Sequence, residues 1–119
     1  MQETRKAILI FHYAEKIKSN LIIAISMLEV LDTLDNDKIS GGERLMTAYF
    51  NALIREVNIA VNASKAQNFS KVRDKLEEAL EQTKQHNYND AIKLVSEAIS
   101  LTTTGGSQAA EILKGKNLI

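Results

Sequence analysis

The chain has 119 residues, which suits one domain with a single buried core. It contains no cysteine, which excludes disulfides, thiolate metal sites and a thiol nucleophile, and no proline, which favours long uninterrupted helices. Fifteen basic residues balance fifteen acidic ones, and this zero net charge argues against an electrostatic nucleic-acid binder, which usually carries a basic excess.

Two apolar runs near the N-terminus bear on localisation. The run from Ala7 to Phe11 is too short for the apolar region of a signal peptide, because His12 and Glu15 soon interrupt it. The run from Leu21 to Leu28 falls well short of the roughly 20 residues that a membrane-spanning helix needs. We therefore expect a cytoplasmic protein with no membrane partner.

The first segment, about residues 4 to 34, has the strongest helical pattern of the chain. Apolar residues recur in an unbroken heptad register, typical of a helix packed at a shallow angle against its neighbours. These residues are Ala7, Ile10, Ala14, Ile17, Leu21, Ala24, Leu28 and Leu31. A second apolar stripe runs along the same helix and consists of Ile8, Phe11, Ile22 and Ile25. Either this helix is central in the bundle, or its second stripe contacts another subunit.

The stretch "DNDKISGGE" predicts a loop, and a second helix follows it over about residues 43 to 66. The next stretch, "QNFSKVRDKLEEALEQ", is echoed nineteen residues later by "HNYNDAIKLVSEAISL". This offset is one helix plus a tight connection, which predicts an antiparallel helical hairpin over about residues 70 to 86 and 89 to 103.

The pair Gly105-Gly106 predicts the end of the fourth helix, and Ser107 can cap a short fifth helix that continues to about Lys114. The predicted fold is therefore all-α. We expect an antiparallel, up-down four-helix bundle with a short fifth C-terminal helix, in one domain that spans residues 1 to 119.

The most economical function is non-enzymatic. We expect a small helical-bundle interaction or assembly protein without a cofactor, which acts through the face of Ile8, Phe11, Ile22 and Ile25. The partner is a protein, either a second copy in a homodimer or a partner helix. The alternative that these side chains only fill a crowded core stays open.

An alternative hypothesis is that the protein is an enzyme whose site consists of two pairs of carboxylates. Glu78 and Glu81 form an E-x-x-E pair, and Glu29 and Asp32 form an E-x-x-D pair. Residues three apart share a helix face, so two such pairs on facing helices could hold Mg²⁺ against a nucleotide phosphate. The pattern resembles parts of the all-α nucleotide pyrophosphohydrolases related to the MazG family, although the order of the two pairs is reversed here. The resemblance implies a Mg²⁺-dependent enzyme with these four ligands.

Two further alternatives involve nucleic acid. Arg5 and His12 have a spacing that is similar to the R-x4-6-H motif of helical ribonucleases of the HEPN class, which implies RNA cleavage. Four basic residues gather around the start of the third helix, and they predict a role as a small subunit of a nucleic-acid complex. They are Lys65, Lys71, Arg73 and Lys75.

Overall fold

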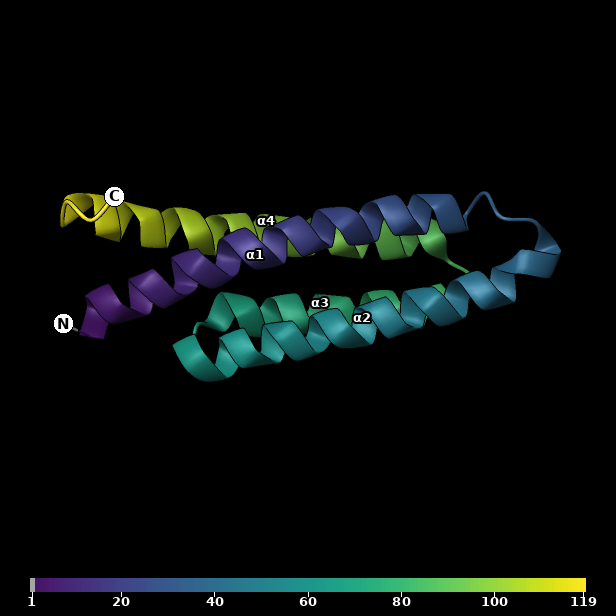
Figure 1. The fold of residues 1–119 in the computed structure, drawn as a ribbon, viewed down its shortest axis with the longest axis horizontal. Helices are drawn as coiled ribbons and strands as arrows, with labels where there is room; N and C mark the ends of the chain where they lie inside the picture. Colours follow the sequence, from purple (N-terminus) through teal and green to yellow (C-terminus); the bar gives the residue numbers. More distant parts are fainter. Residues whose placement is uncertain (1) are drawn as a thin grey trace.

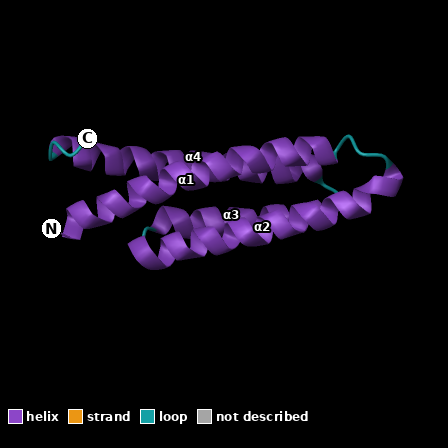
Figure 2. Cartoon of the chain, in the orientation of Figure 1, coloured by secondary structure: helices purple, strands orange, loops and turns teal. Residues whose placement is uncertain are grey.

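The computed structural model describes residues 2–119, and in these residues it contains four α-helices and no strand (Figures 1 and 2). The helices are α1 (Gln2–Leu31), α2 (Asn36–Ser64), α3 (Gln67–Lys84) and α4 (Tyr88–Gly115). Connections of two to four residues join them, so consecutive helices run antiparallel. The prediction of an all-α helical bundle is confirmed.

The four helices are arranged as an elongated bundle of 55 × 21 × 17 Å. Helix α1 contacts α2 and α4, and α3 contacts the same two helices. The backbones of the diagonal pairs, α1 with α3 and α2 with α4, lie farther apart, with no two Cα atoms within 8 Å among the described residues. Both chain ends lie at the same end of the bundle, as expected for four antiparallel helices (Figure 1).

The core follows the predicted heptad register of α1. Seven of its eight positions are buried, and Ile10 is half-buried. The other helices contribute fully buried side chains that include Phe50, Phe69, Leu76 and Val95. The register is preserved because an apolar stripe of period 3.5 keeps facing its neighbours at a shallow crossing angle.

The prediction of a separate fifth helix is wrong, because α4 continues without a break through Gly105 and Gly106. Both glycines lie at close helix contacts. A Cβ on Gly106 would lie 3.1 Å from the Cβ of Ala14, and one on Gly105 would lie 3.2 Å from Nδ2 of Asn68. Glycine therefore allows α4 to approach α1 and α3, and this packing offsets the weak helix propensity of the pair.

The predicted loop "DNDKISGGE" is also largely helical, because α2 begins at Asn36 rather than near residue 43. A Cβ on Gly42 would lie 2.6 Å from a methyl carbon of Leu34 and 2.8 Å from one of Leu31. A larger side chain at residue 42 would push these leucines aside, so Gly42 lets the start of α2 pass close to the end of α1.

Helices α1 and α4 extend beyond the α2–α3 turn at the end that carries the termini (Figure 1). A second, small apolar cluster of Ala7, Ala109 and Leu113 holds these extensions together, with Phe11 and Ile112 packed against it. Within the described residues, we find no helix whose length and apolarity together would let it cross a membrane.

Candidate interaction surfaces

The four residues of the predicted second stripe of α1 do not form one surface. Ile8 and Ile22 are each 50% exposed, whereas Phe11 and Ile25 are only partly exposed. Ile25 packs against the main core, and Phe11 packs against the small cluster between α1 and α4. Phe11 and Ile25 therefore help to fill the core, as the alternative in the sequence analysis expected. Ile8 and Ile22 remain candidates for an interaction surface.

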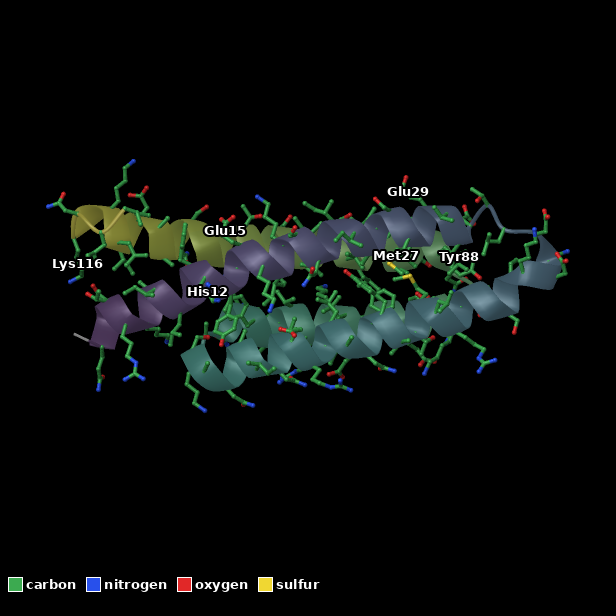
Figure 3. The ribbon with its side chains drawn as sticks, viewed as in Figure 1. His12, Glu15, Met27, Glu29, Tyr88 and Lys116 are labelled. Carbon is green, nitrogen blue, oxygen red and sulfur yellow. The ribbon has the colours of Figure 1, made fainter. Side chains whose placement is uncertain are left out.

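An apolar groove lies between α1 and α2, near the connection that joins them. Its volume is about 430 Å³, and none of its lining residues is charged. Its largest exposed side chains are those of Ile22, Ile23, Val30 and Leu45, with exposed fractions of 50%, 47%, 59% and 72%. We call these four residues the groove face. Met27 lies on the side of α1 that faces α2 and forms part of the groove, while Glu29 lies on the side away from α2 (Figure 3).

The groove face coincides with an uncharged stretch of α1. The ten residues from Ser19 to Leu28, "SNLIIAISML", contain no acidic or basic side chain. Lys18 precedes this stretch and Glu29 follows it, and neither takes part in an ion pair within residues 2–119. Exposed apolar area of this kind marks interaction sites in water-soluble folds.

The sequence pattern pointed to Ile22 but missed Ile23, Val30 and Leu45. The first two depart from the heptad register, and Leu45 belongs to another helix. The signal that could have found them is the absence of charge from Ser19 to Leu28, which leaves the outer side of α1 apolar as well as its inner side.

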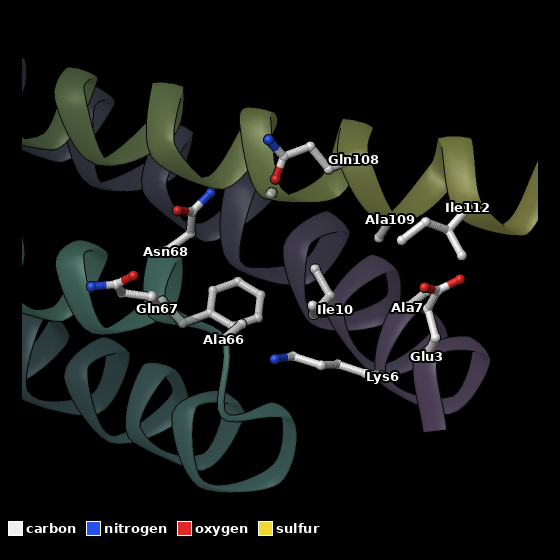
Figure 4. A pocket seen from close by; sticks show the side chains of 12 residues that line it. Glu3, Lys6, Ala7, Ile10, Ala66, Gln67, Asn68, Gln108, Ala109 and Ile112 are labelled. Carbon is white, nitrogen blue, oxygen red and sulfur yellow. The ribbon is translucent and has the colours of Figure 1, made fainter. Parts of the chain in front are cut away.

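A second apolar cleft lies at the end of the bundle where α1 and α4 extend past the α2–α3 turn (Figure 4). Its volume is about 280 Å³. The side chains of Ile10, Phe69 and Ile112 provide its large apolar lining. Small residues and the polar residues Lys6, Gln67, Asn68 and Gln108 line the rest. Glu3 from the start of α1 also lines it (Figure 4). The cleft contains no buried polar group without a partner among the described residues.

A polar cluster of Glu43, His86 and Tyr88 lies at the opposite end of the bundle. His86 Nδ1 lies 2.5 Å from Oε2 of Glu43, and the Tyr88 hydroxyl donates a hydrogen bond to the same oxygen. Burial, the hydrogen bond to Glu43 and the negative charges of Glu43 and Asp32 raise the pKa of Tyr88 to about 12. The cluster ties the α3–α4 connection to α2. No sequence pattern predicts this cluster, because residues 43 and 86 are far apart in the chain.

The four carboxylates of the magnesium reading are not brought together. Glu29 lies in the last turn of α1 and Asp32 directly follows that helix, whereas Glu78 and Glu81 lie on α3, which is diagonal to α1 and has no Cα atom within 8 Å of it. All four side chains are exposed. Within residues 2–119, no group of three or more acidic or histidine side chains is placed to hold a metal ion.

The basic residues near the start of α3 are partly neutralised by acidic neighbours. Lys75 Nζ lies 3.2 Å from Glu97, and Arg73 lies within 3.8 Å of both Asp74 and Glu77. Lys65 and Lys71 are exposed, and Lys65 lies in the α2–α3 turn with a φ of 57°. The four residues therefore do not form a continuous basic stripe.

Arg5 and His12 are both exposed on α1, two turns apart. The ring of His12 packs edge-on against the ring of Tyr13, with centroids 5.4 Å apart. Arg5 and His12 are therefore two surface residues of one helix.

Comparison with known proteins adds no relative: no family model, no curated protein and no solved structure matches the chain.

Proposed function

We propose that the protein is a small non-enzymatic assembly protein that forms a homodimer through the groove face of α1 and α2. The observation that carries this proposal is the cluster of Ile22, Ile23, Val30 and Leu45, which lies at an apolar groove of about 430 Å³. Each of these side chains is about half exposed or more, and the ten-residue stretch around Ile22 and Ile23 is uncharged. Association would remove this apolar area from water.

A second copy of the chain is the occupant that we propose. On α2, the exposed residues Leu45, Ala48, Ala52 and Ile59 continue the apolar surface along one side of the helix, with Leu45 and Ile59 at equal distances from Ala52. A stripe with a large apolar side chain at each end and small residues between them is self-complementary in an antiparallel pair, as a symmetric dimer requires, because residue i of one copy meets residue j of the other and the reverse.

The size of the apolar face predicts a weak dimer. Fully burying an Ile, Leu or Val side chain stabilises by about 1.5–3 kcal/mol, so eight half-exposed side chains in a symmetric pair contribute about 6–12 kcal/mol. Association costs about 4–15 kcal/mol in lost translational and rotational freedom. The difference corresponds to a dissociation constant in the micromolar range or weaker.

Sedimentation equilibrium over a dilution series, on the order of 1 μM to 1 mM, tests this proposal directly. We expect the mean mass to rise from the 13.2 kDa of one chain toward twice that value as the concentration increases. A mass that stays at 13.2 kDa over the whole series contradicts the proposal.

A further inference from the structure

We infer that the cleft between α1, α3 and α4 binds a small aliphatic carboxylate, with the carboxylate beside Lys6 and the hydrocarbon chain over Ile10 and Ile112. The cleft lies at the end of the bundle that carries the chain termini. It shares no lining residue with the groove between α1 and α2, so this binding site does not depend on the proposed dimer.

The size of the cleft limits the ligand to a short chain. Its volume of about 280 Å³ is close to the lower end of the range of about 300–1,000 Å³ for ligand sites. Its lining runs from Glu3 to Ile10 on α1 and from Gly105 to Ile112 on α4. Each of these helical segments rises by about 10 Å. An extended chain gains about 1.2 Å per bond, so a chain of about eight carbons fits along this length.

The apolar lining of the cleft is suited to a hydrocarbon chain. Ile10 and Ile112 are half-buried, and Phe69 is almost completely buried. Ala7 and Ala109 add methyl groups from the two helices that extend past the α2–α3 turn. A ligand chain in the cleft would remove from water the parts of Ile10 and Ile112 that the fold leaves exposed, and this burial favours binding.

The charges that line the cleft favour an anion. The carboxylate of Glu3 lies 4.0 Å from Nζ of Lys116, so its charge already has a partner. Lys6 takes part in no ion pair within residues 2–119. Figure 4 shows Lys6 extending from α1 toward Ala66, while Glu3 lies beside Ala7 on the other side of the cleft. The side of the cleft near Ala66 therefore offers an unpaired positive charge.

Amide side chains add hydrogen-bond donors to the lining. Gln67 and Gln108 line the cleft, and neither makes a side-chain hydrogen bond in the part of the chain that the structure describes. The first turn of α3, which begins at Gln67, contains no acidic side chain, and the exposed Lys65 precedes it by two residues. A carboxylate can accept hydrogen bonds from these amides, and such charge-assisted bonds are stronger than neutral ones.

The groove between α1 and α2 differs from the cleft in the chemistry that it can recognise. The groove is larger, with a volume of about 430 Å³, but none of its lining residues is charged. It can cover a hydrocarbon chain but offers no cation to a carboxylate. An aliphatic acid should therefore prefer the cleft, and the preference should disappear for a neutral alcohol of the same chain length.

The experiment is a titration followed by the amide chemical shifts of the protein. The ligands are octanoate, hexanoate, 1-octanol and octylammonium. Octanoate has about ten non-hydrogen atoms, and for a ligand of this size we expect a dissociation constant on the order of 1 mM. Hexanoate should bind about sixteenfold more weakly, since each buried CH₂ contributes about fourfold. Octylammonium, with the opposite charge, should bind about tenfold more weakly than octanoate.

Two variants test the assigned role of the lysine. Lys6→Met removes the charge but keeps an unbranched side chain at an exposed position, so the fold should be preserved. We expect it to weaken octanoate binding about three- to fivefold and to leave 1-octanol binding unchanged. Lys38→Met is the matched control, because Lys38 is exposed near the start of α2, at the opposite end of the bundle, and the net charge changes equally. It should affect neither ligand.

The site is supported if octanoate shifts the amide signals of the residues that line the cleft and Lys6→Met alone weakens it. Shifts that gather around Ile22 and Leu45 instead would place the ligand in the groove and overturn the assignment. An absence of octanoate binding, equal binding of octylammonium, equal binding of hexanoate, or equal effects of Lys6→Met and Lys38→Met would also overturn it. None of these results bears on the homodimer, which the sedimentation series tests separately.

Discussion

Gly106 of α4 lies so close to Ala14 of α1 that a Cβ at residue 106 would be only 3.1 Å from the Cβ of Ala14. The contact explains why α4 continues where a glycine pair would ordinarily end a helix. It joins α1 and α4 at the level where α3 begins, because the neighbouring Gly105 lies against Asn68 of α3.

Replacing this glycine tests whether the close approach is needed. Gly41→Ala should stabilise the protein by about 0.5–1 kcal/mol, because alanine favours helix and nothing lies within 4 Å of the added Cβ. Gly106→Ala gains the same helix propensity but must move α1 and α4 apart by a few tenths of an ångström, so its stabilisation should be smaller or reversed. Urea unfolding of both variants measures the difference, and equal stabilisation would show that the contact is loose.

The polar cluster at the other end of the bundle makes a prediction about stability. Tyr88→Phe removes a hydrogen bond to the Glu43 carboxylate, and we expect a loss of about 1–3 kcal/mol in the free energy of unfolding at neutral pH. The stability is lost because the Glu43 carboxylate then has one hydrogen-bond donor fewer. Chemical denaturation of the variant beside the unchanged protein gives the value, and an unchanged midpoint would mean that solvent replaces the hydroxyl without cost.

The raised pKa of Tyr88 adds a dependence on pH with a defined sign. The phenol ionises at a pKa of about 12 in the folded protein against 10.0 for the unperturbed group, so the folded state holds this proton more tightly. The stabilisation is fully present below pH 10.0 and is lost as the pH rises toward about 12. The difference in unfolding free energy between the protein and Tyr88→Phe should therefore shrink over this interval. A difference that stays constant would contradict the burial of the phenol.

The magnesium reading can be tested by ligand-induced stabilisation. Because the two carboxylate pairs lie on diagonal helices and form no metal-holding group among the described residues, Mg²⁺ together with a mixture of nucleoside triphosphates should leave the melting temperature unchanged. A ligand present at a hundredfold its dissociation constant would add about 2.7 kcal/mol. A shift that needs both metal and nucleotide, and that disappears in Glu78→Gln, would restore the four-carboxylate site and overturn the non-enzymatic proposal.

Much of the fold could be predicted from the sequence because its signal is periodic. The heptad register of α1 depends on local spacing, and burial of Leu21 and Leu28 follows from it. Glycine is ambiguous, since the same residue ends a helix or allows two helices to approach. Only the position of Ala14 decides between these roles for Gly106.

The candidate interaction face could be predicted only in part. Ile22 and Ile25 belong to one apolar stripe in the sequence, yet Ile25 packs against the core and Ile22 stays half exposed. Which neighbour covers which side of α1 is a property of the assembled bundle. The same is true of Leu45, which reaches the groove from α2, and of the contact between Glu43 and His86. Both depend on how the helices pack, which local sequence patterns do not show.

The most direct test of the proposed dimer compares two substitutions on α1 that are alike in everything except their place. Ile22 and Ile8 are both 50% exposed and fourteen residues apart, but only Ile22 belongs to the groove face. Sedimentation of Ile22→Glu and Ile8→Glu should show a monomer of 13.2 kDa for the first and the dimerisation of the unchanged protein for the second. Equal self-association of both variants would contradict the groove face as the dimer contact.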